Sequence, residues 1–461
     1  EFRRVLFRSG ETKRSFETRL PHVMAITRIE GSAAGLERLS SIQTSPLDDE
    51  DKVRLLHAKI ELEGFRGNAD AIEVMSREAC VLSERIGSKS LLLLSRVALS
   101  WAHRLAGRAN EAITTLLSID CEPQDMSPEE RLDYYSALSA AYVLAQRRKE
   151  AIATTLLALE VAIEEKINTG IGAMLSSLTN QHLAIGDVQQ ATYFVQRASD
   201  LHRQREETGI IACINRLYEG LCLTAVGRYG SALDVLSEIH QRLLAGQDGI
   251  WMHAAANALA LVYLRLGRTD LALRLLDDLP PEIPPLHRAR RSAMKAMVLK
   301  VRGEPHRAHL ERAFDAIDPW IDTSLQLALI DDAPNLPIGA GAELCARAIA
   351  LGTEQGLRPL ELLARTRLIE ICIRTGDLAA IATHAEEACE MLNACAHPEI
   401  YPPELAVIIA DGLRRVNRPE LAQELTARTT TWVYEASANV PEALTGSFAN
   451  AHPANRCLRK N

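Results

Sequence analysis

Hydrophobic side chains recur at helical spacing along almost the whole chain, and short polar turns interrupt them. The clearest example is 250–279, where aliphatic residues at 259–266 and at 271–276 are separated by Gly267. Steps of three and four residues place side chains on one face of a helix. Glycine tolerates the left-handed backbone that ends many helices, and Thr269 or Asp270 offers a polar side chain to cap the next one. The pattern predicts a helical hairpin.

The same arrangement returns about every 40 residues, a period typical of stacked two-helix units. Each copy has a small or basic residue, a short polar gap, and an alanine that usually precedes an aliphatic residue. The alanines of these copies are Ala71, Ala112, Ala151, Ala191, Ala232, Ala272 and Ala308, and further copies follow at 376–380 and 417–422. We expect these alanines where two helices cross too closely for a larger side chain. About nine to ten units then fill nearly the whole chain and leave no room for a separate globular domain.

The units resemble tetratricopeptide repeats. A glycine stands three to five residues before the helical alanine in several copies, and Tyr142 and Tyr263 each lie nine residues before theirs. Ordinary tetratricopeptide repeats have about 34 residues, so these longer units resemble the elongated repeats of the maltose-regulator type. HEAT repeats are the structural rival, but they lack the Gly-Arg-x-x-x-Ala phrase. The resemblance implies an all-α protein, a right-handed α-α superhelix (solenoid) of about nine to ten tetratricopeptide-like hairpins.

We divide the chain accordingly. Residues 1–10 look like a non-native cloning or assembly scar, 11–50 are an N-terminal helix and capping region, 51–437 are the repeat array, and 438–461 are a C-terminal tail. The stretch near 318–345 is the least regular part, because Pro334 and Pro337 interrupt the helical pattern there. We expect a superhelical kink or a loop at this point.

The tail carries a second resemblance. Trp432 to Ala436 is followed by Val440-Pro441-Glu442-Ala443 and by a segment from Ser447 to Arg456 that is rich in alanine and asparagine. This is similar to the closing segment of large bacterial signalling regulators, which join a winged-helix and bacterial transcriptional activation domain to a central ATPase and a tetratricopeptide array. The resemblance implies that the chain is the sensor part of such a regulator, with ATPase and DNA-binding modules covalently attached. The chain itself has no Gly-x-x-x-x-Gly-Lys-Ser/Thr loop.

Composition supports helices and disfavours other classes. Hydrophobic residues make up 47% of the chain but aromatic residues only 4%, which suits helices packed through alanine and leucine. The formal net charge of -8 argues against a direct grip on nucleic acid. No apolar run approaches the length of about 18 residues that a membrane span requires. The nine cysteines form no Cys-x-x-Cys pair and are expected to be reduced core thiols of a cytoplasmic protein.

No constellation of residues points to catalysis, a metal or a cofactor. Gly339 and Gly341 precede a helix, but the strand, third glycine and lysine of a phosphate-binding loop are missing. The histidines are spread over different units without a His-Glu-x-x-His motif. Adjacent carboxylates such as Glu164 and Glu165 point about 100° apart on a helix and do not form an acid–base pair. We therefore expect a protein that is not an enzyme and uses no cofactor.

Five residues on the expected first helices are candidates for a ligand-binding groove: Trp101, Arg104, Asn180, Asn257 and Arg265. First helices face the concave surface in tetratricopeptide arrays, and tryptophan and arginine are enriched where binding energy concentrates. Asparagine is a poor helix former, so its presence inside two helices suggests a role in binding. The competing explanation is structural, with Trp101 filling core space and the arginines complementing helix C-termini.

The leading hypothesis is a sensor scaffold whose groove holds a protein, a peptide or a small-molecule effector. The alternative is a stand-alone adaptor that assembles other proteins and has no transcriptional role. A third hypothesis, a hydrolase or cyclase with an unrecognised site, would require a cleft with a cluster of perturbed titratable groups.

Overall fold

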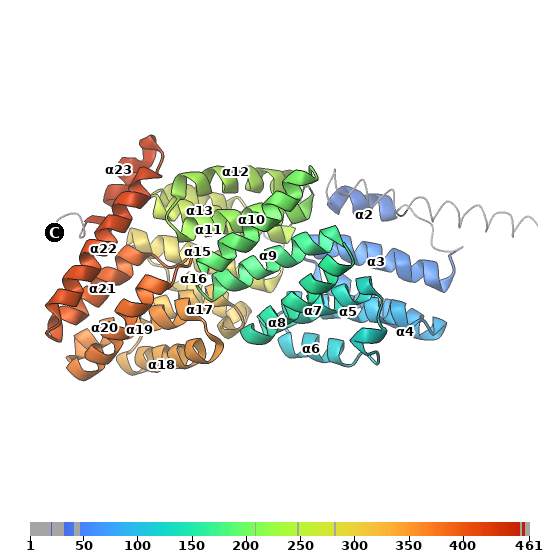
Figure 1. Ribbon diagram of the computed structural model, residues 1–461, viewed down its shortest axis with the longest axis horizontal. Coiled ribbons are helices and arrows are strands. Elements are labelled where there is room, and N and C mark those ends of the chain that lie inside the picture. The colour runs from blue at the N-terminus through green and yellow to red at the C-terminus, as the bar shows by residue number, and fades with distance from the viewer. Residues whose placement is uncertain are drawn as a thin grey trace, which may run out of the picture.

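The computed structural model describes residues 20, 32–40, 47–207, 209–246, 249–280, 283–451 and 454–456. Within them the secondary structure is helical, without strands, and ten consecutive helical hairpins follow one another from Asp49 to Ala438 (Figure 1). This confirms the predicted all-α solenoid of about nine to ten hairpins. The proposed scar at 1–10 lies outside the described residues, as does most of 11–46.

The ten hairpins are α3 (Asp49–Arg66) with α4 (Ala69–Ile86), α5 (Lys89–Leu105) with α6 (Ala109–Leu117), α7 (Pro128–Leu144) with α8 (Arg148–Glu164), α9 (Asn168–Ala184) with α10 (Val188–Gln204), α11 (Ile210–Ala225) with α12 (Tyr229–Gly246), α13 (Gly249–Arg265) with α14 (Thr269–Asp277), α15 (Pro285–Arg302) with α16 (Arg307–Ala316), α17 (Thr323–Asp331) with α18 (Ile338–Gln355), α19 (Arg358–Thr375) with α20 (Leu378–Ala394), and α21 (Pro402–Arg415) with α22 (Pro419–Ala438). Helix α2 (Ser32–Ser40) precedes the array and α23 (Glu442–Ala451) follows it. Short 3-10 helices are η1 (Pro123–Asp125), η2 (Pro319–Ile321) and η3 (Ala333–Asn335), the last two within the stretch 318–345.

The turn inside a typical hairpin depends on one residue with left-handed backbone. Gly267, where we expect such a turn, has a φ of 74°. The same conformation recurs in the fourth hairpin at Gly186 (φ 80°) and in the tenth at Asn417 (φ 60°), where asparagine takes the place of glycine. The predicted polar cap of the following helix is wrong for Thr269 and Asp270. Arg268 holds the cap position, and the Asp270 carboxylate instead accepts hydrogen bonds from Arg268 at 3.1 and 3.0 Å.

The fourth residue of each second helix is buried, and in α6, α8, α10, α12, α14 and α22 this residue is the recurring alanine. Five of the predicted alanines have no exposed surface: Ala112, Ala151, Ala191, Ala232 and Ala272. The expectation is wrong at Ala71 and Ala308. Because α4 begins at Ala69 and α16 at Arg307, the fourth position falls on Ile72 and Leu310, which are buried instead.

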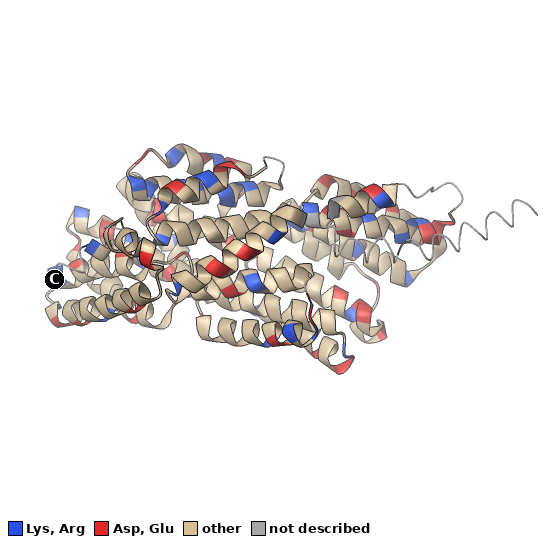
Figure 2. Ribbon diagram, turned by 90° about the horizontal axis from the view of Figure 1, so that it is seen from above, with Lys and Arg blue, Asp and Glu red and all other residues tan. Residues whose placement is uncertain are grey.

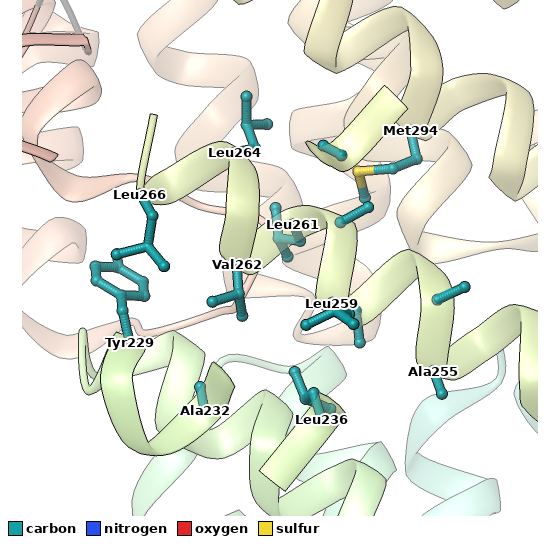
Figure 3. Packing of buried hydrophobic residues seen from close by; sticks show 14 of the residues in the cluster. Tyr229, Ala232, Leu236, Ala255, Leu259, Leu261, Val262, Leu264, Leu266 and Met294 are labelled. Atoms are coloured by element: carbon teal, nitrogen blue, oxygen red, sulfur yellow. The ribbon is translucent and has the colours of Figure 1, made fainter. Parts of the chain in front are cut away.

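Figure 3 shows how this position builds the core between α12 and α13. Ala232 and Leu236 of α12 face Leu259 and Val262 of α13, and the Tyr229 ring lies beside Leu266. All of these side chains are at most 4% exposed. Each hairpin thus buries one face internally and the other against its neighbour, as the repeat pattern requires.

Hairpins that are about five units apart in the sequence contact each other across the superhelix. A Cβ at Gly107 would lie 2.7 Å from Ile317, and one at Gly186 would lie 2.6 Å from the Cys395 sulfur. The backbone of Ala396 also donates a hydrogen bond to the Gly186 carbonyl at 3.2 Å. The partners of each pair are separated by about 210 residues. The turns of the first hairpins are therefore buried by the second half of the chain, and the glycines there allow the close approach.

The tail docks onto α12, the C-terminal end of α13 and the segment just before α21. Phe448 of α23 is buried beside Tyr229, with ring centroids 5.8 Å apart. Ser447 donates a hydrogen bond to the Leu266 carbonyl at 2.5 Å, and the Tyr401 hydroxyl donates one to Asn455 at 2.7 Å. The residues that suggested a regulator tail therefore have a packing role in closing the end of the array.

Charged residues are interspersed over the helices without a large face of one sign (Figure 2). None of the described helices is long and apolar enough to cross a membrane. The eight cysteines of the described residues are free thiols, and six of them are buried, as predicted for core cysteines. Burial raises the pKa of the Cys345 and Cys395 thiols to about 12, which makes them unreactive.

Candidate ligand-binding cavity

The first helices of six consecutive hairpins surround a cavity of about 650 Å³ on the inside of the superhelix. We call it the central cavity, and α5, α7, α9, α11, α13 and α15 supply most of its wall. Most lining side chains are apolar, and a limited set of polar groups points in among them. A cavity of this size with a few convergent polar groups has the usual character of a ligand site.

The structure brings four of the five predicted site residues together. Trp101, Arg104, Asn180 and Asn257 all line the central cavity, from α5, α9 and α13. Arg265 does not line it. Its side chain is 3% exposed, donates a hydrogen bond to the Glu399 carbonyl at 2.7 Å, and lies 4.9 Å from the centre of the Tyr401 ring. Arg265 does lie on a first helix, as predicted. The segment 395–401, between α20 and α21, covers its side chain.

Trp101 has one face in the core and another on the cavity. It packs with Ile60, Ala98 and Ala102. Its ring lies so close to Gly64 of α3 that a Cβ there would be 2.0 Å from the ring. The structural explanation is confirmed, because the residue fills core space between α3 and α5. Part of the residue also lines the cavity, and its role in binding stays a prediction.

Asn180 and Asn257 are half-buried amides that face the cavity. No hydrogen bond joins either side chain to another described residue, and the Asn257 oxygen is buried without a partner. A buried acceptor without a hydrogen bond costs roughly 1–3 kcal/mol. The side-chain nitrogen of the nearby Gln181 donates to Ser139 at 3.1 Å and to Thr155 at 2.8 Å, although its side-chain oxygen is also buried without a partner. The two asparagines are therefore available to a ligand, and Gln181 is held by the wall.

Two arginines face the cavity without a carboxylate partner. Arg104 makes no hydrogen bond or ion pair with another described residue, and its Nε is buried. Arg148, at the start of α8, donates hydrogen bonds only to the neutral oxygens of Gln146 at 3.3 Å and Thr323 at 2.8 Å, and the Asp322 carboxylate acts on it only through its charge. Burial lowers the pKa of each guanidinium to about 10, so both stay charged at neutral pH.

A third arginine in the cavity wall is paired. Arg290 of α15 donates to the Asp322 carboxylate at 2.5 and 3.2 Å, and this pairing holds the Asp322 pKa below its ordinary value despite burial. Glu399 lies close enough to this ion pair for both charges to act on it. One of its oxygens accepts a hydrogen bond from Ser324 at 2.6 Å, and the other has no partner. Burial raises the Glu399 pKa to about 7.

Glu399 and Met297 also line a second cavity of about 330 Å³, so they form the partition between the two. The second cavity is surrounded by α15, α17, α19 and α21. Two buried arginines line it. Arg265 bonds to the Glu399 carbonyl, and Arg367 is fully paired, with Asp331 and Glu404 in contact and Glu370 at 3.2 Å. These carboxylates raise the Arg367 pKa well above its ordinary value.

A third cavity, about 1000 Å³, lies between α10, α11 and α22, with Trp432 and Arg228 in its wall. It is larger than the central cavity, but no buried side-chain atom without a hydrogen-bond partner faces it among the described residues. We therefore place the candidate site in the central cavity.

Sequence reasoning missed Arg148, Arg290, Asp322 and Glu399. Arg148 is the first residue of a second helix, next to the turn, where a charged side chain is normally solvated. Asp322 and Glu399 lie outside the regular helices. Only the closure of the superhelix brings Thr323 and Ile321 onto the turn at 146–148, 175 residues earlier. Arg290 carried a weak signal, since it lies four residues after Leu286 on the inward face of α15.

No group of three or more possible metal ligands occurs in the part of the chain that the structure describes. The buried histidines of the site region are uncharged at neutral pH, because burial lowers the pKa of His287 and His397 to about 3. The cavity thus offers amide, guanidinium and apolar groups, which suit binding.

No protein-family model matches the chain, and no curated protein matches its sequence. Among solved structures, the chain is similar to NprR in complex with its cognate peptide NprX, with a TM-score of 0.51 and 14% identity over 72% of this chain and 99% of that one. A Rap protein complexed with competence and sporulation factor gives a TM-score of 0.46 and 14% identity over 85% of this chain and 100% of that one.

A signal transduction ATPase with a tetratricopeptide repeat sensor, from Pyrococcus horikoshii, gives a TM-score of 0.38 and 12% identity over 90% of this chain and 54% of that one. At such identities the likeness concerns the fold alone, and the NprR comparison supports a tetratricopeptide-like superhelix.

Proposed function

We propose that this chain is a regulatory scaffold that binds a short peptide, or an extended segment of a partner protein, in the central cavity. The observation that carries the proposal is the pair Asn180 and Asn257, whose amides face the cavity without protein partners. A side-chain amide both donates and accepts hydrogen bonds, and these are the two functions that an extended peptide backbone presents. Trp101 adds an apolar surface of the kind that anchors ligands.

The fold gives a precedent for this use. The similar structure of NprR holds a cognate peptide, and a peptide-binding regulator of that kind is the role we propose here. Binding, not catalysis, is proposed. The Ser324 hydroxyl does bond to the Glu399 carboxylate in the cavity wall, but among the described residues no histidine side chain bonds to either of these two groups.

A ligand in the central cavity would contact helices from several hairpins at once. Asn180 and Asn257 come from α9 and α13, which are two hairpins apart. A ligand that bridges them favours the superhelical curvature that fits it best, and the population shifts toward that curvature. The exposed outer surface then reports occupancy to a partner.

We also propose a more specific role for this scaffold. It is the cytoplasmic sensor of a larger bacterial regulator with attached ATPase and DNA-binding modules, and it consists of the array 51–437 and the tail 438–461. This proposal rests on the resemblance of the tail. Reading the coding sequence upstream in frame tests it: a phosphate-binding loop preceded by a winged-helix pattern is expected. A stand-alone adaptor, the alternative, has neither.

Selection of short peptides on the full chain, followed by titration calorimetry, tests the binding proposal. The double variant Asn180→Leu with Asn257→Leu is expected to bind selected peptides at least tenfold more weakly, because each lost hydrogen bond is worth about 1 kcal/mol or more. Asn110→Leu is the matched control, since Asn110 is exposed on α6, away from the cavity. Unchanged affinity in the double variant, or failure to select any peptide, contradicts the proposal.

A further inference from the structure

The charges around the central cavity do not balance. Three arginines line it, Arg104, Arg148 and Arg290, against two carboxylic acids, Asp322 and Glu399. His287 also lines it and stays neutral. Since Arg290 is paired with Asp322, the remaining groups are two arginines and one glutamic acid whose pKa burial raises to about 7.

Arg148 is the better enclosed of the two unpaired arginines. Its side chain is 4% exposed, its contacts are with the neutral oxygens of Gln146 and Thr323, and its Nε has no partner. A guanidinium offers five donor hydrogens, and hydrogen bonds to a charged acceptor are about twice as strong as those to neutral ones. A buried arginine with neutral partners therefore retains most of its affinity for an anion.

Arg104 offers an independent second point of positive charge. It lies in the last turn of α5, one helical turn after Trp101, and lines the same cavity as Asn180 and Asn257. No charged side chain shifts its pKa, which burial alone lowers. The ion pairs of neighbouring Arg108, with Glu73 and Glu111, do not include it.

We propose that the ligand of the central cavity is an acidic peptide, whose carboxylates pair with Arg104 and Arg148 while its backbone binds the asparagines. This rests on the proposed peptide-binding function and specifies its ligand class. An extended polyanion such as nucleic acid does not fit a cavity of about 650 Å³, and the chain's net charge of -8 opposes its approach. A short peptide with Asp, Glu or a free C-terminus places one or two carboxylates inside the wall.

Titration of the full chain with two pools of short peptides tests this. The pools have amidated C-termini and are identical except that one has Asp and Glu where the other has Asn and Gln. We expect the acidic pool to bind at least tenfold more tightly, and Arg104→Gln and Arg148→Gln each to remove most of that difference. Arg274→Gln, at an exposed arginine of α14, is the matched control and should leave it unchanged.

The outcomes separate the two proposals. Equal binding of both pools overturns the acidic preference and keeps peptide binding, whereas no binding of either pool, nor of a Lys- and Arg-containing pool, overturns the proposed function as well. Binding of inorganic phosphate but of no peptide shows an anion site of a different ligand class and also overturns the inference. Because Arg104 makes no bond to described residues, Arg104→Gln should fold with an unchanged melting temperature, which guards against misreading a folding defect.

Discussion

Arg148, at the start of the second helix α8, and Arg367, in the middle of the first helix α19, are each 4% exposed beside an internal cavity. Their surroundings are opposite. Arg367 is paired with Asp331, Glu370 and Glu404, and its pKa is raised. Arg148 forms hydrogen bonds only with neutral groups, and burial lowers its pKa to about 10 although the nearby Asp322 carboxylate acts to raise it.

The difference separates a structural charge from an available one. The Arg367 cluster satisfies itself and ties α17, α19 and α21 together, with Lys300 of α15 also bonded to Asp331 at 2.6 Å. In the central cavity two arginines without a carboxylate hydrogen bond and the Asn257 oxygen are left unsatisfied, at a cost to stability that a ligand would offset. The Arg367 cluster thus holds helices together, whereas the central cavity is left prepared for binding.

The largest expected effect is on the Arg367 cluster. Arg367→Met leaves the half-buried carboxylates of Asp331 and Glu404 without their main partner, which should lower the free energy of unfolding by about 3 kcal/mol, the low end for a broken buried ion pair. The matched change Arg148→Met removes only bonds to neutral groups and a desolvated charge, so it should cost about 1 kcal/mol or less. Urea unfolding of both variants measures the contrast, and equal losses would mean that the two sites are not different in kind.

A smaller effect is expected at the partition, where Glu399 has a folded pKa of about 7 against an ordinary value of 4.5. The folded state holds this proton more tightly, so the contribution of Glu399 to stability is present below pH 4.5 and is lost as the pH rises to about 7. Glu399→Gln avoids that loss and should be more stable than the parent at pH 8 by about 1–3 kcal/mol.

The difference between the Glu399→Gln variant and the parent should shrink toward pH 5. The buried histidines act in the opposite sense, since the lowered pKa values of His287 and His397 make stability fall as the pH drops below about 6.5. They are present in both proteins and cancel in the comparison. Urea midpoints at pH 5 and pH 8 measure the difference, and a gap that does not depend on pH would show that Glu399 is ionised throughout.

The smallest expected effect tests the unsatisfied amide. Asn257→Leu removes a buried oxygen without a partner and replaces a poor helix former, so it should stabilise the chain by about 0.5–1 kcal/mol. Ser139→Ala is the contrast, because Ser139 bonds to Gln181 and its loss should destabilise the wall by about 1 kcal/mol. Thermal unfolding compares the two, and destabilisation by Asn257→Leu would show that the amide already has a structural partner.

The candidate site was partly predictable. Trp101, Arg104, Asn180 and Asn257 lie on first helices, and the hairpin pattern is sufficient to place first helices on the inside of the superhelix. Arg265 obeys the same rule, yet Tyr401 and Glu399 cover it, because the segment between α20 and α21 enters the interior. That entry leaves no periodic signal in the sequence.

The sequence by itself determined the hairpins, their period, the left-handed turn at Gly267 and the buried alanines such as Ala151, because each of these depends on residues within one unit or its neighbour. The tertiary structure alone decided which side chains line the central cavity together, which arginine is paired, and where the tail docks. Those contacts join residues about 175 to 210 positions apart. They depend on the small rotation between successive hairpins, which accumulates over about five units and is set by packing along the whole array.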